Sequence, residues 1–309
     1  MRFFTLLHIA EKEKSTHNNR SKSFADQIRI YVKCIKTLHA SLKYAGYELA
    51  AITNNKAYFE QFLEGYAIDV IELHFAMNVP SGVSFFSTHY KNEVYQYFGT
   101  LNDDYVVLMD SDIICINKMP QSFMSCVESG IPLYYDISDQ MHPTFGQDVL
   151  LKDKKVVDKS AKVGIWAGGE FIGGRPEFFR QLYQQMEEFS PAYFAKINEF
   201  THQGDEFLTS VAIENGILNK QYAILNAGML GIICRYWSYP TKHEQPALHV
   251  YKKHFFLHLP SNKKLLAGID IEKINFKGIY SYLKPRIAVS HLINVVKDIV
   301  KKFLPPQKH

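Results

Sequence analysis

In the first part of the chain, short apolar runs alternate with longer segments whose apolar residues recur at helical spacing. Short apolar runs that change sharply to polar residues are typical of buried strands. Residues 24–44 carry the helical spacing, and Gly46 terminates the helix that they predict. A second helix is predicted at 87–101, and strands are predicted at 3–9, 48–53, 67–75 and 105–114. This alternation of strands and helices predicts an α/β fold with a mostly parallel, Rossmann-like central sheet and flanking helices.

The pattern is less regular after this first part. Residues 11–23 are polar and rich in turn formers, which predicts a loop. Further strands are expected at 132–138 and 163–174, and further helices at 178–189 and 205–216. A strand that runs into a loop is expected at 254–266. No repeat or low-complexity tract interrupts the chain.

The C-terminal segment differs from the rest because its helical apolar pattern is decorated with basic residues. We therefore divide the chain into a domain at 1–279 and a basic amphipathic helical tail at 280–309. Such a helix can lie on an anionic membrane, or it can dock on the domain with its lysines in solvent. The basic residues are Lys284, Arg286, Lys297, Lys301 and Lys302.

Composition and charge describe an ordinary globular chain. Hydrophobic residues make up 47% and charged residues 21% of its 309 residues. The net charge of +4 suits an anionic small substrate or a weak contact with a membrane surface, and it is too small to indicate nucleic acid. The 4 cysteines are scattered, which favours reduced thiols over a zinc site or a disulfide framework. No stretch is long and apolar enough to cross a bilayer, so we expect a cytoplasmic protein that reaches the inner face of the cell membrane only peripherally.

The strongest chemical signal is a pair of aspartates at the end of a predicted buried strand. Asp110 and Asp112 are two residues apart, so an extended chain would point both to one face. In open α/β sheets, ligands bind beyond the carboxyl ends of the strands. Two carboxylates there suit Mg²⁺ or Mn²⁺, with diphosphate oxygens completing the coordination. Such a cation would neutralise the charge of a departing nucleoside diphosphate.

An acidic pair of this kind is common, and other interpretations remain open. The two aspartates can be solvated residues of a turn. A phosphatase of the haloacid-dehalogenase type also ends a strand in two aspartates. That motif usually lies near the start of the chain with Thr or Val two residues after the second aspartate, whereas Ile114 takes this position here.

Residues 103–118 resemble the strand that carries the paired aspartates in the glycogenin and lipopolysaccharide galactosyltransferase family. Lys91 matches a basic residue of that family that contacts the donor. The segment HLPSNKK resembles the family's H-x-x-G-x-x-K motif, with His258 and Lys264 at its His and Lys and with Ser261 in place of its Gly. The resemblance implies that His258 is the third metal ligand and that Lys264 holds the diphosphate. Read from the residues alone, His258 can also be a satisfied core histidine.

Two further segments are similar to the histo-blood-group ABO transferase family, at 166–174 and 202–213. The resemblance implies that Glu206 lies beneath the donor sugar, and we expect Glu206, with Asp205, near the anomeric carbon of the donor. Acidic residues at this place can also stabilise the first turn of a helix, because they cap its free N–H groups and interact favourably with the helix dipole. Glu170 is a charge within an apolar strand, so it either faces solvent or belongs to a site that binds donor or acceptor hydroxyls.

Both families have the GT-A fold and retain the anomeric configuration, and the two resemblances together imply a GT-A glycosyltransferase. The expected donor is a nucleotide-sugar, with UDP-sugar favoured, and the expected acceptor is a glycan or a lipid-linked saccharide. The expected cofactor is Mn²⁺ or Mg²⁺, and no nucleic acid is expected as a partner. The phosphatase and a non-catalytic glycan-binding protein of the same fold remain the alternatives.

Overall fold

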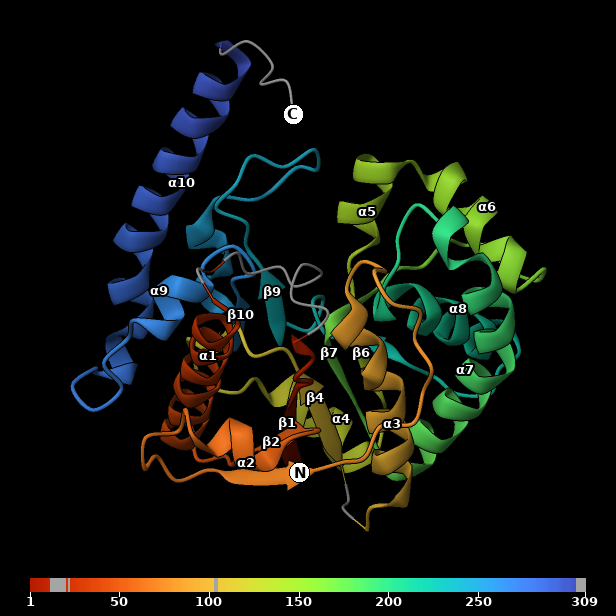
Figure 1. Ribbon diagram of the computed structural model, residues 1–309, viewed down its shortest axis with the longest axis horizontal. Coiled ribbons are helices and arrows are strands. Elements are labelled where there is room, and N and C mark those ends of the chain that lie inside the picture. Colours follow the sequence, from red (N-terminus) through yellow and green to blue (C-terminus); the bar gives the residue numbers. More distant parts are fainter. Residues whose placement is uncertain (12–20, 22, 103–104, 304–309) are drawn as a thin grey trace.

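The structure is a computed structural model that describes residues 1–11, 21, 23–102 and 105–303 (Figure 1). The loop expected at 11–23 lies almost entirely outside these residues, as do the last six residues of the expected tail, 304–309. Figure 1 shows a body of strands and helices from which one long helix near the C-terminus extends.

The main sheet has seven strands in the order β3-β2-β1-β4-β7-β6-β8. Its first four strands are parallel, β7 runs antiparallel between β4 and β6, and β8 is parallel to β6. The prediction of a mostly parallel central sheet is therefore confirmed. The strands are β1 (Arg2–Leu7), β2 (Leu49–Thr53), β3 (Asp69–Glu72), β4 (Val106–Met109), β6 (Leu133–Asp136), β7 (Ala167–Gly174) and β8 (Leu225–Asn226).

Helices cover this sheet, and the helix predicted at 24–44 occupies the predicted residues. α1 (Phe24–Tyr44) begins after Ser23, whose side chain accepts a hydrogen bond from the Asp26 amide. It ends before Gly46, which adopts a positive φ of 90°. The helix predicted at 87–101 is a 3₁₀ turn, η2 (Phe86–Tyr90), followed by α3 (Lys91–Thr100). The other helices of the body are α2 (Lys56–Glu60), α4 (Gln121–Ser129), α5 (Ser138–Phe145), α6 (Gln147–Val157), α7 (Pro176–Lys196), α8 (Asp205–Leu218) and α9 (Lys263–Ala267).

A second, three-stranded sheet has the order β5-β10-β9 and consists of β5 (Ile113–Cys115), β10 (Phe256–His258) and β9 (Ile233–Arg235). The strand predicted at 105–114 is thus two strands, because the chain turns at 110–112 and passes from the main sheet to this one. β10 is antiparallel to β5 and parallel to β9, with His258 opposite both Ile113 and Arg235. This pairing places β5 beside β10, which lies in the C-terminal part of the chain.

The predicted tail is the helix α10 (Ile279–Phe303). Its first turns are part of the body, because Leu283 and Ile287 are fully buried in a hydrophobic cluster with residues of β5, β9 and β10. A boundary at residue 279 stays a prediction, and cutting the chain there would remove side chains from this cluster.

Candidate active site between the two sheets

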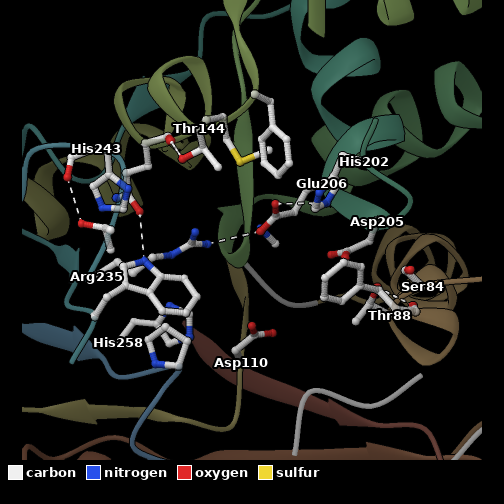
Figure 2. Close-up of a pocket in the computed structure, with 18 of the residues that line it drawn as sticks. Ser84, Thr88, Asp110, Thr144, His202, Asp205, Glu206, Arg235, His243 and His258 are labelled. Atoms are coloured by element: carbon white, nitrogen blue, oxygen red, sulfur yellow. Dashed lines mark hydrogen bonds and ion pairs between the residues drawn. The ribbon is translucent and has the colours of Figure 1, made fainter. Parts of the chain in front are cut away.

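A cleft of about 710 Å³ lies where the main sheet gives way to the second sheet (Figure 2). The end of β4, the first turn of α8, the helix α5 and the segments 235–243 and 258–263 contribute to its wall. Six of the predicted site residues line it: Lys91, Asp110, Asp112, Asp205, Glu206 and His258. The other two, Glu170 and Lys264, are not among its lining residues.

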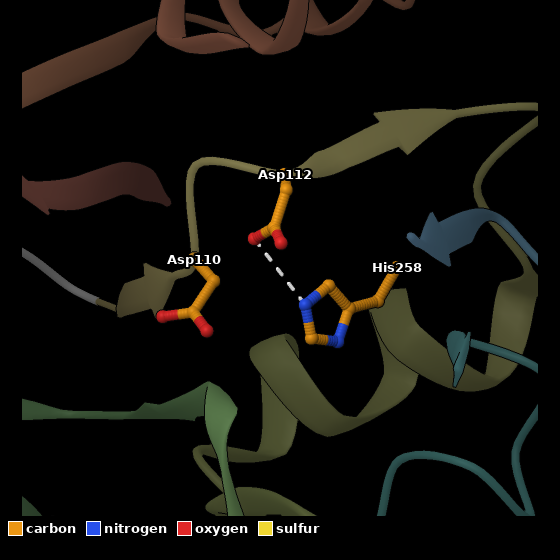
Figure 3. A group of neighbouring side chains, drawn as sticks. All are labelled: Asp110, Asp112 and His258. Atoms are coloured by element: carbon orange, nitrogen blue, oxygen red, sulfur yellow. Dashed lines mark ion pairs between the residues drawn. The ribbon is translucent and has the colours of Figure 1, made fainter. Parts of the chain in front are cut away.

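Asp110, Asp112 and His258 form a group that could hold a metal ion (Figure 3). One ligand atom from each lies within 4.8 Å of the others. The two aspartates meet because the chain turns between β4 and β5, not because an extended strand alternates its faces. The pairing of β10 with β5 then brings His258 beside them, and Leu259 donates a backbone hydrogen bond of 3.0 Å to Asp112.

The imidazole of His258 is oriented by a second carboxylate. Its Nδ1 lies 3.1 Å from Glu170 Oε1, and its buried Nε2 lies 3.3 Å from Asp112 Oδ1 without a well-oriented hydrogen bond. Donation from Nδ1 to Glu170 leaves the Nε2 lone pair directed at the carboxylates, as in metal-binding histidines. Burial alone would lower the pKa of His258, but Asp112 and Glu170 outweigh it and raise the pKa to about 9. A metal ion would therefore have to displace a proton from this ring.

Two lysines neutralise the aspartates of this group. Lys91 Nζ lies 2.8 Å from Asp110 Oδ1 and 3.0 Å from Asp205 Oδ2, and it donates to the Gly169 carbonyl at 2.7 Å. A Cβ on Gly169 would lie 2.3 Å from Asp205 Oδ2, so the absence of a side chain there makes room for this ion pair. Lys263 Nζ donates to Asp112 Oδ2.

Glu206 faces the cleft and is held by several donors. Its carboxylate accepts from the Gly169 amide at 3.2 Å and from Trp166 Nε1 at 3.3 Å. The guanidinium of Arg235 lies 3.2 Å from the same carboxylate (Figure 2). These contacts fix the direction in which the carboxylate presents its charge to the cleft.

Arg235 was not predicted from the sequence, although a lone charge within the apolar run IICRYW is the same kind of signal as Glu170. Its side chain makes a bidentate ion pair with Glu170, which is fully buried, and it also contacts Glu206. Glu170 therefore lies beneath the cleft, where it joins His258 to Arg235, and it is not among the residues that line the cleft.

The charges of the site leave room for a divalent cation. Five carboxylates are gathered here, namely Asp110, Asp112, Glu170, Asp205 and Glu206. Three permanent cations oppose them, namely Lys91, Lys263 and Arg235. Two negative charges remain before the imidazoles are counted, and a divalent cation would balance them. Two carboxylates and one imidazole form a donor set that fits Mn²⁺, and Mg²⁺ is compatible with its oxygens.

The lysine that enters the cleft is Lys263, not Lys264. Lys263 lines the cleft and contacts Asp112, whereas Lys264 is exposed on α9 and makes no ion pair among the described residues. The two lysines are adjacent at the start of α9, so the direction of that helix decides which of them reaches the cleft.

Comparisons with known proteins find similar solved structures but no match by sequence. No family model and no curated protein matches the sequence. The galactosyltransferase LgtC, solved with donor and acceptor sugar analogs, is 11% identical, with 87% of this chain and 95% of that chain covered and a TM-score of 0.50. An active-site mutant of LgtC gives the same values. The chain has the GT-A fold. This confirms the expected fold.

A bifunctional glycosyltransferase, WbbM, is a weaker match, with 8% identity, a TM-score of 0.48, and coverage of 92% of this chain and 51% of that chain. At 11% identity the likeness to LgtC establishes the GT-A fold alone and leaves activity to the residues of the cleft. In this GT-A fold the cleft lies beyond the carboxyl end of β4, which is where open α/β sheets bind their ligands.

Proposed function

We propose that this protein is a metal-dependent glycosyltransferase that moves a sugar from a nucleotide-sugar to a saccharide or glycolipid acceptor. The observation that carries the proposal is the group of Asp110, Asp112 and His258, which opens into the same cleft as Glu206. A UDP-sugar is the proposed donor and retention the proposed stereochemical outcome. The solved complex of LgtC with donor and acceptor sugar analogs supports this class of substrates.

Asp110, Asp112 and His258 would hold Mn²⁺ or Mg²⁺. Such an ion supplies positive charge that stabilises the diphosphate as the glycosidic bond breaks. Lys263 would carry part of the same task, because its ammonium group lines the cleft beside Asp112. Lys91 already forms ion pairs with both Asp110 and Asp205. Its main proposed role is therefore to fix the position of these two carboxylates, and it would contact the donor only where the donor meets them.

Glu206 would present its carboxylate to the anomeric carbon. Positive charge develops on the sugar ring as the bond to the diphosphate breaks, and a fixed carboxylate nearby stabilises it. The amide of Gly169, the indole of Trp166 and the guanidinium of Arg235 keep Glu206 in one orientation. Asp205 is buried and paired with Lys91, which favours Glu206 as the residue that faces the sugar.

Aromatic residues of the cleft wall would hold the acceptor. Phe145, Trp237 and Tyr239 line the cleft, and the guanidinium of Arg235 lies 5.8 Å from the ring of Trp237. Flat aromatic surfaces suit the apolar faces of sugar rings and leave hydroxyls to polar neighbours.

The direct test of the function is a thermal-shift panel of UDP-, GDP- and CMP-sugars with and without Mn²⁺. A UDP-sugar at about 100 times its Kd, together with Mn²⁺, should raise the Tm by roughly 5 °C, because ligands that bind only the folded state stabilise it. EDTA should remove the shift. A chain that no nucleotide-sugar stabilises, or that is stabilised equally in EDTA, contradicts the proposal.

The adjacent lysines of α9 give a matched pair of variants. Lys263→Met should raise the KM for the donor by about tenfold to a hundredfold, because a charge-assisted hydrogen bond to the diphosphate is lost. Lys264→Met removes the same charge one residue away and should leave the KM within about twofold. Donor KM values at saturating Mn²⁺ measure both. A larger rise in KM for Lys264→Met than for Lys263→Met would instead assign diphosphate binding to Lys264.

A further inference from the structure

α10 presents two unlike faces. Its inner face packs on the body through Ile279, Leu283 and Ile287, and Asn294 is also buried on this side. Its outer face carries six large aliphatic side chains that are 47% to 64% exposed. They recur every three or four residues, with adjacent pairs at 292–293 and 299–300, and so form one stripe along the helix. The outer stripe consists of Val289, Leu292, Ile293, Val296, Ile299 and Val300.

The charges on α10 are almost all of one sign. Lys284, Arg286 and Lys297 are exposed on α10, before and within the segment that carries the outer stripe, and the sequence continues with Lys301 and Lys302. Asp298 is the single acid between Ile279 and Phe303. An apolar stripe of this size, flanked by cations, complements an anionic lipid surface. No helix among the described residues is long and apolar enough to span a membrane.

A buried polar network joins α10 to two segments of the cleft wall. Asn294 Nδ2 donates to the Ser238 carbonyl at 3.0 Å, and Ser290 Oγ accepts from Asn262 Nδ2 at 3.0 Å. Ser238 Oγ donates to Asn262 Oδ1 at 2.7 Å, and the Ser238 amide donates to Ser261 Oγ at 2.9 Å. Ser238 and Asn262 are both buried, so these bonds are made away from water.

The residues on either side of this network line the cleft. Ser238 lies between Trp237 and Tyr239, and Asn262 lies between Pro260 and Lys263. The helix therefore holds both segments through their buried neighbours. Figure 1 shows the C-terminal turns of α10 extending past the body at the top of the view, and α5, which contributes to the cleft wall, also lies in the upper part of the view.

We propose that the outer stripe of α10 docks on an anionic lipid bilayer surface, and that the Ser238 network holds the mouth of the cleft toward that surface. Docking would restrain α10, and the network would pass the restraint to residues 237–243. Where the proposed glycosyltransferase function holds, a lipid-linked saccharide is the acceptor that this arrangement suits. The docking itself rests on α10 alone.

Co-sedimentation with vesicles tests the docking surface. The full chain should bind vesicles of phosphatidylglycerol and phosphatidylcholine in equal parts, and should bind pure phosphatidylcholine far less. Val296→Glu should weaken binding about tenfold, because it removes an apolar contact and adds repulsion. Val156→Glu is the matched control, since Val156 on α6 is 49% exposed and Val296 is 50% exposed. Equal losses in both variants, or a stripe that instead forms a dimer abolished by Val296→Glu, would overturn the proposal.

Hydrogen–deuterium exchange tests the link to the cleft. Adding the anionic vesicles should slow exchange both in the outer turns of α10 and in peptides that cover residues 237–243. Asn294→Ala keeps the outer stripe, so it should retain vesicle binding and protection of α10 while losing protection at 237–243. Protection confined to α10 in the unaltered chain would refute the link. Neither measurement needs a sugar donor or a metal, so either can succeed or fail independently of the proposed activity.

Discussion

Asp112→Asn is expected to lower glycosyl transfer by on the order of 10³-fold, because a divalent cation held beside the leaving group stabilises the transition state by several kcal/mol. Asparagine keeps the shape of the side chain and removes the charge that faces both His258 and Lys263. Mn²⁺ affinity should fall with the activity. Steady-state transfer rates and calorimetric titration with Mn²⁺ measure the two effects.

Three comparisons keep this result interpretable. Asp110→Asn should cause a similar loss, because Asp110 belongs to the same metal group. Asp148→Asn removes one charge from an exposed position on α6 and should leave transfer unchanged. Thermal unfolding of each variant shows whether the fold survives, since Asp112 is buried. Transfer that persists in EDTA, or an Asp112 variant as active as the Asp148 variant, would rule out the metal.

Glu214→Gln is expected to reduce the free energy of unfolding by roughly 3–5 kcal/mol, because it leaves a buried ammonium group without its counter-charge. Lys154 and Glu214 are both fully buried and form an ion pair between α6 and α8. Burial lowers the pKa of Lys154, and Glu214 acts against that shift. Glu214 also accepts hydrogen bonds from the backbone amides of Lys162 and Val163, and these bonds fix the segment that precedes β7.

Urea unfolding measures this loss through the shift in midpoint at constant slope. Glu177→Gln is the matched control, since it breaks an exposed pair with Arg180 and should cost less than about 1 kcal/mol. Adding Lys154→Met to Glu214→Gln should recover much of the stability, because the unpaired charge is removed while the amide oxygen can still accept from the backbone. A Glu214 variant as stable as the Glu177 variant would disprove the buried pair.

The elements that could be predicted are those whose pattern is local. α1 follows its apolar period from Phe24 to Tyr44, and β2 fills a short apolar run. The run at 105–114 looked continuous because every residue before Asp110 is apolar and β-forming. Its division into β4 and β5 depends on pairing with β10, about 140 residues later in the chain, which no local pattern contains.

The candidate site divides along the same line. The paired aspartates and His258 were visible because each follows or ends a strand. The role of Glu170 beneath the cleft could not be predicted, because it depends on Arg235 in a distant strand of the other sheet. The choice between Lys263 and Lys264 depends on where α9 begins and which way it faces, and adjacent identical residues give no sign of that. α5 was also missed, since Pro143 lies within it and proline usually argues against a helix.

The metal group draws its members from both sides of the junction between the two sheets. Asp110 leaves the main sheet at the end of β4, whereas His258 belongs to β10 of the second sheet. An ion bound by both would act as a cross-link between the N-terminal and C-terminal halves of the chain. Loading the ion would then stiffen the whole molecule as well as complete its chemistry, and the free protein would be the form most open to proteolysis at this junction.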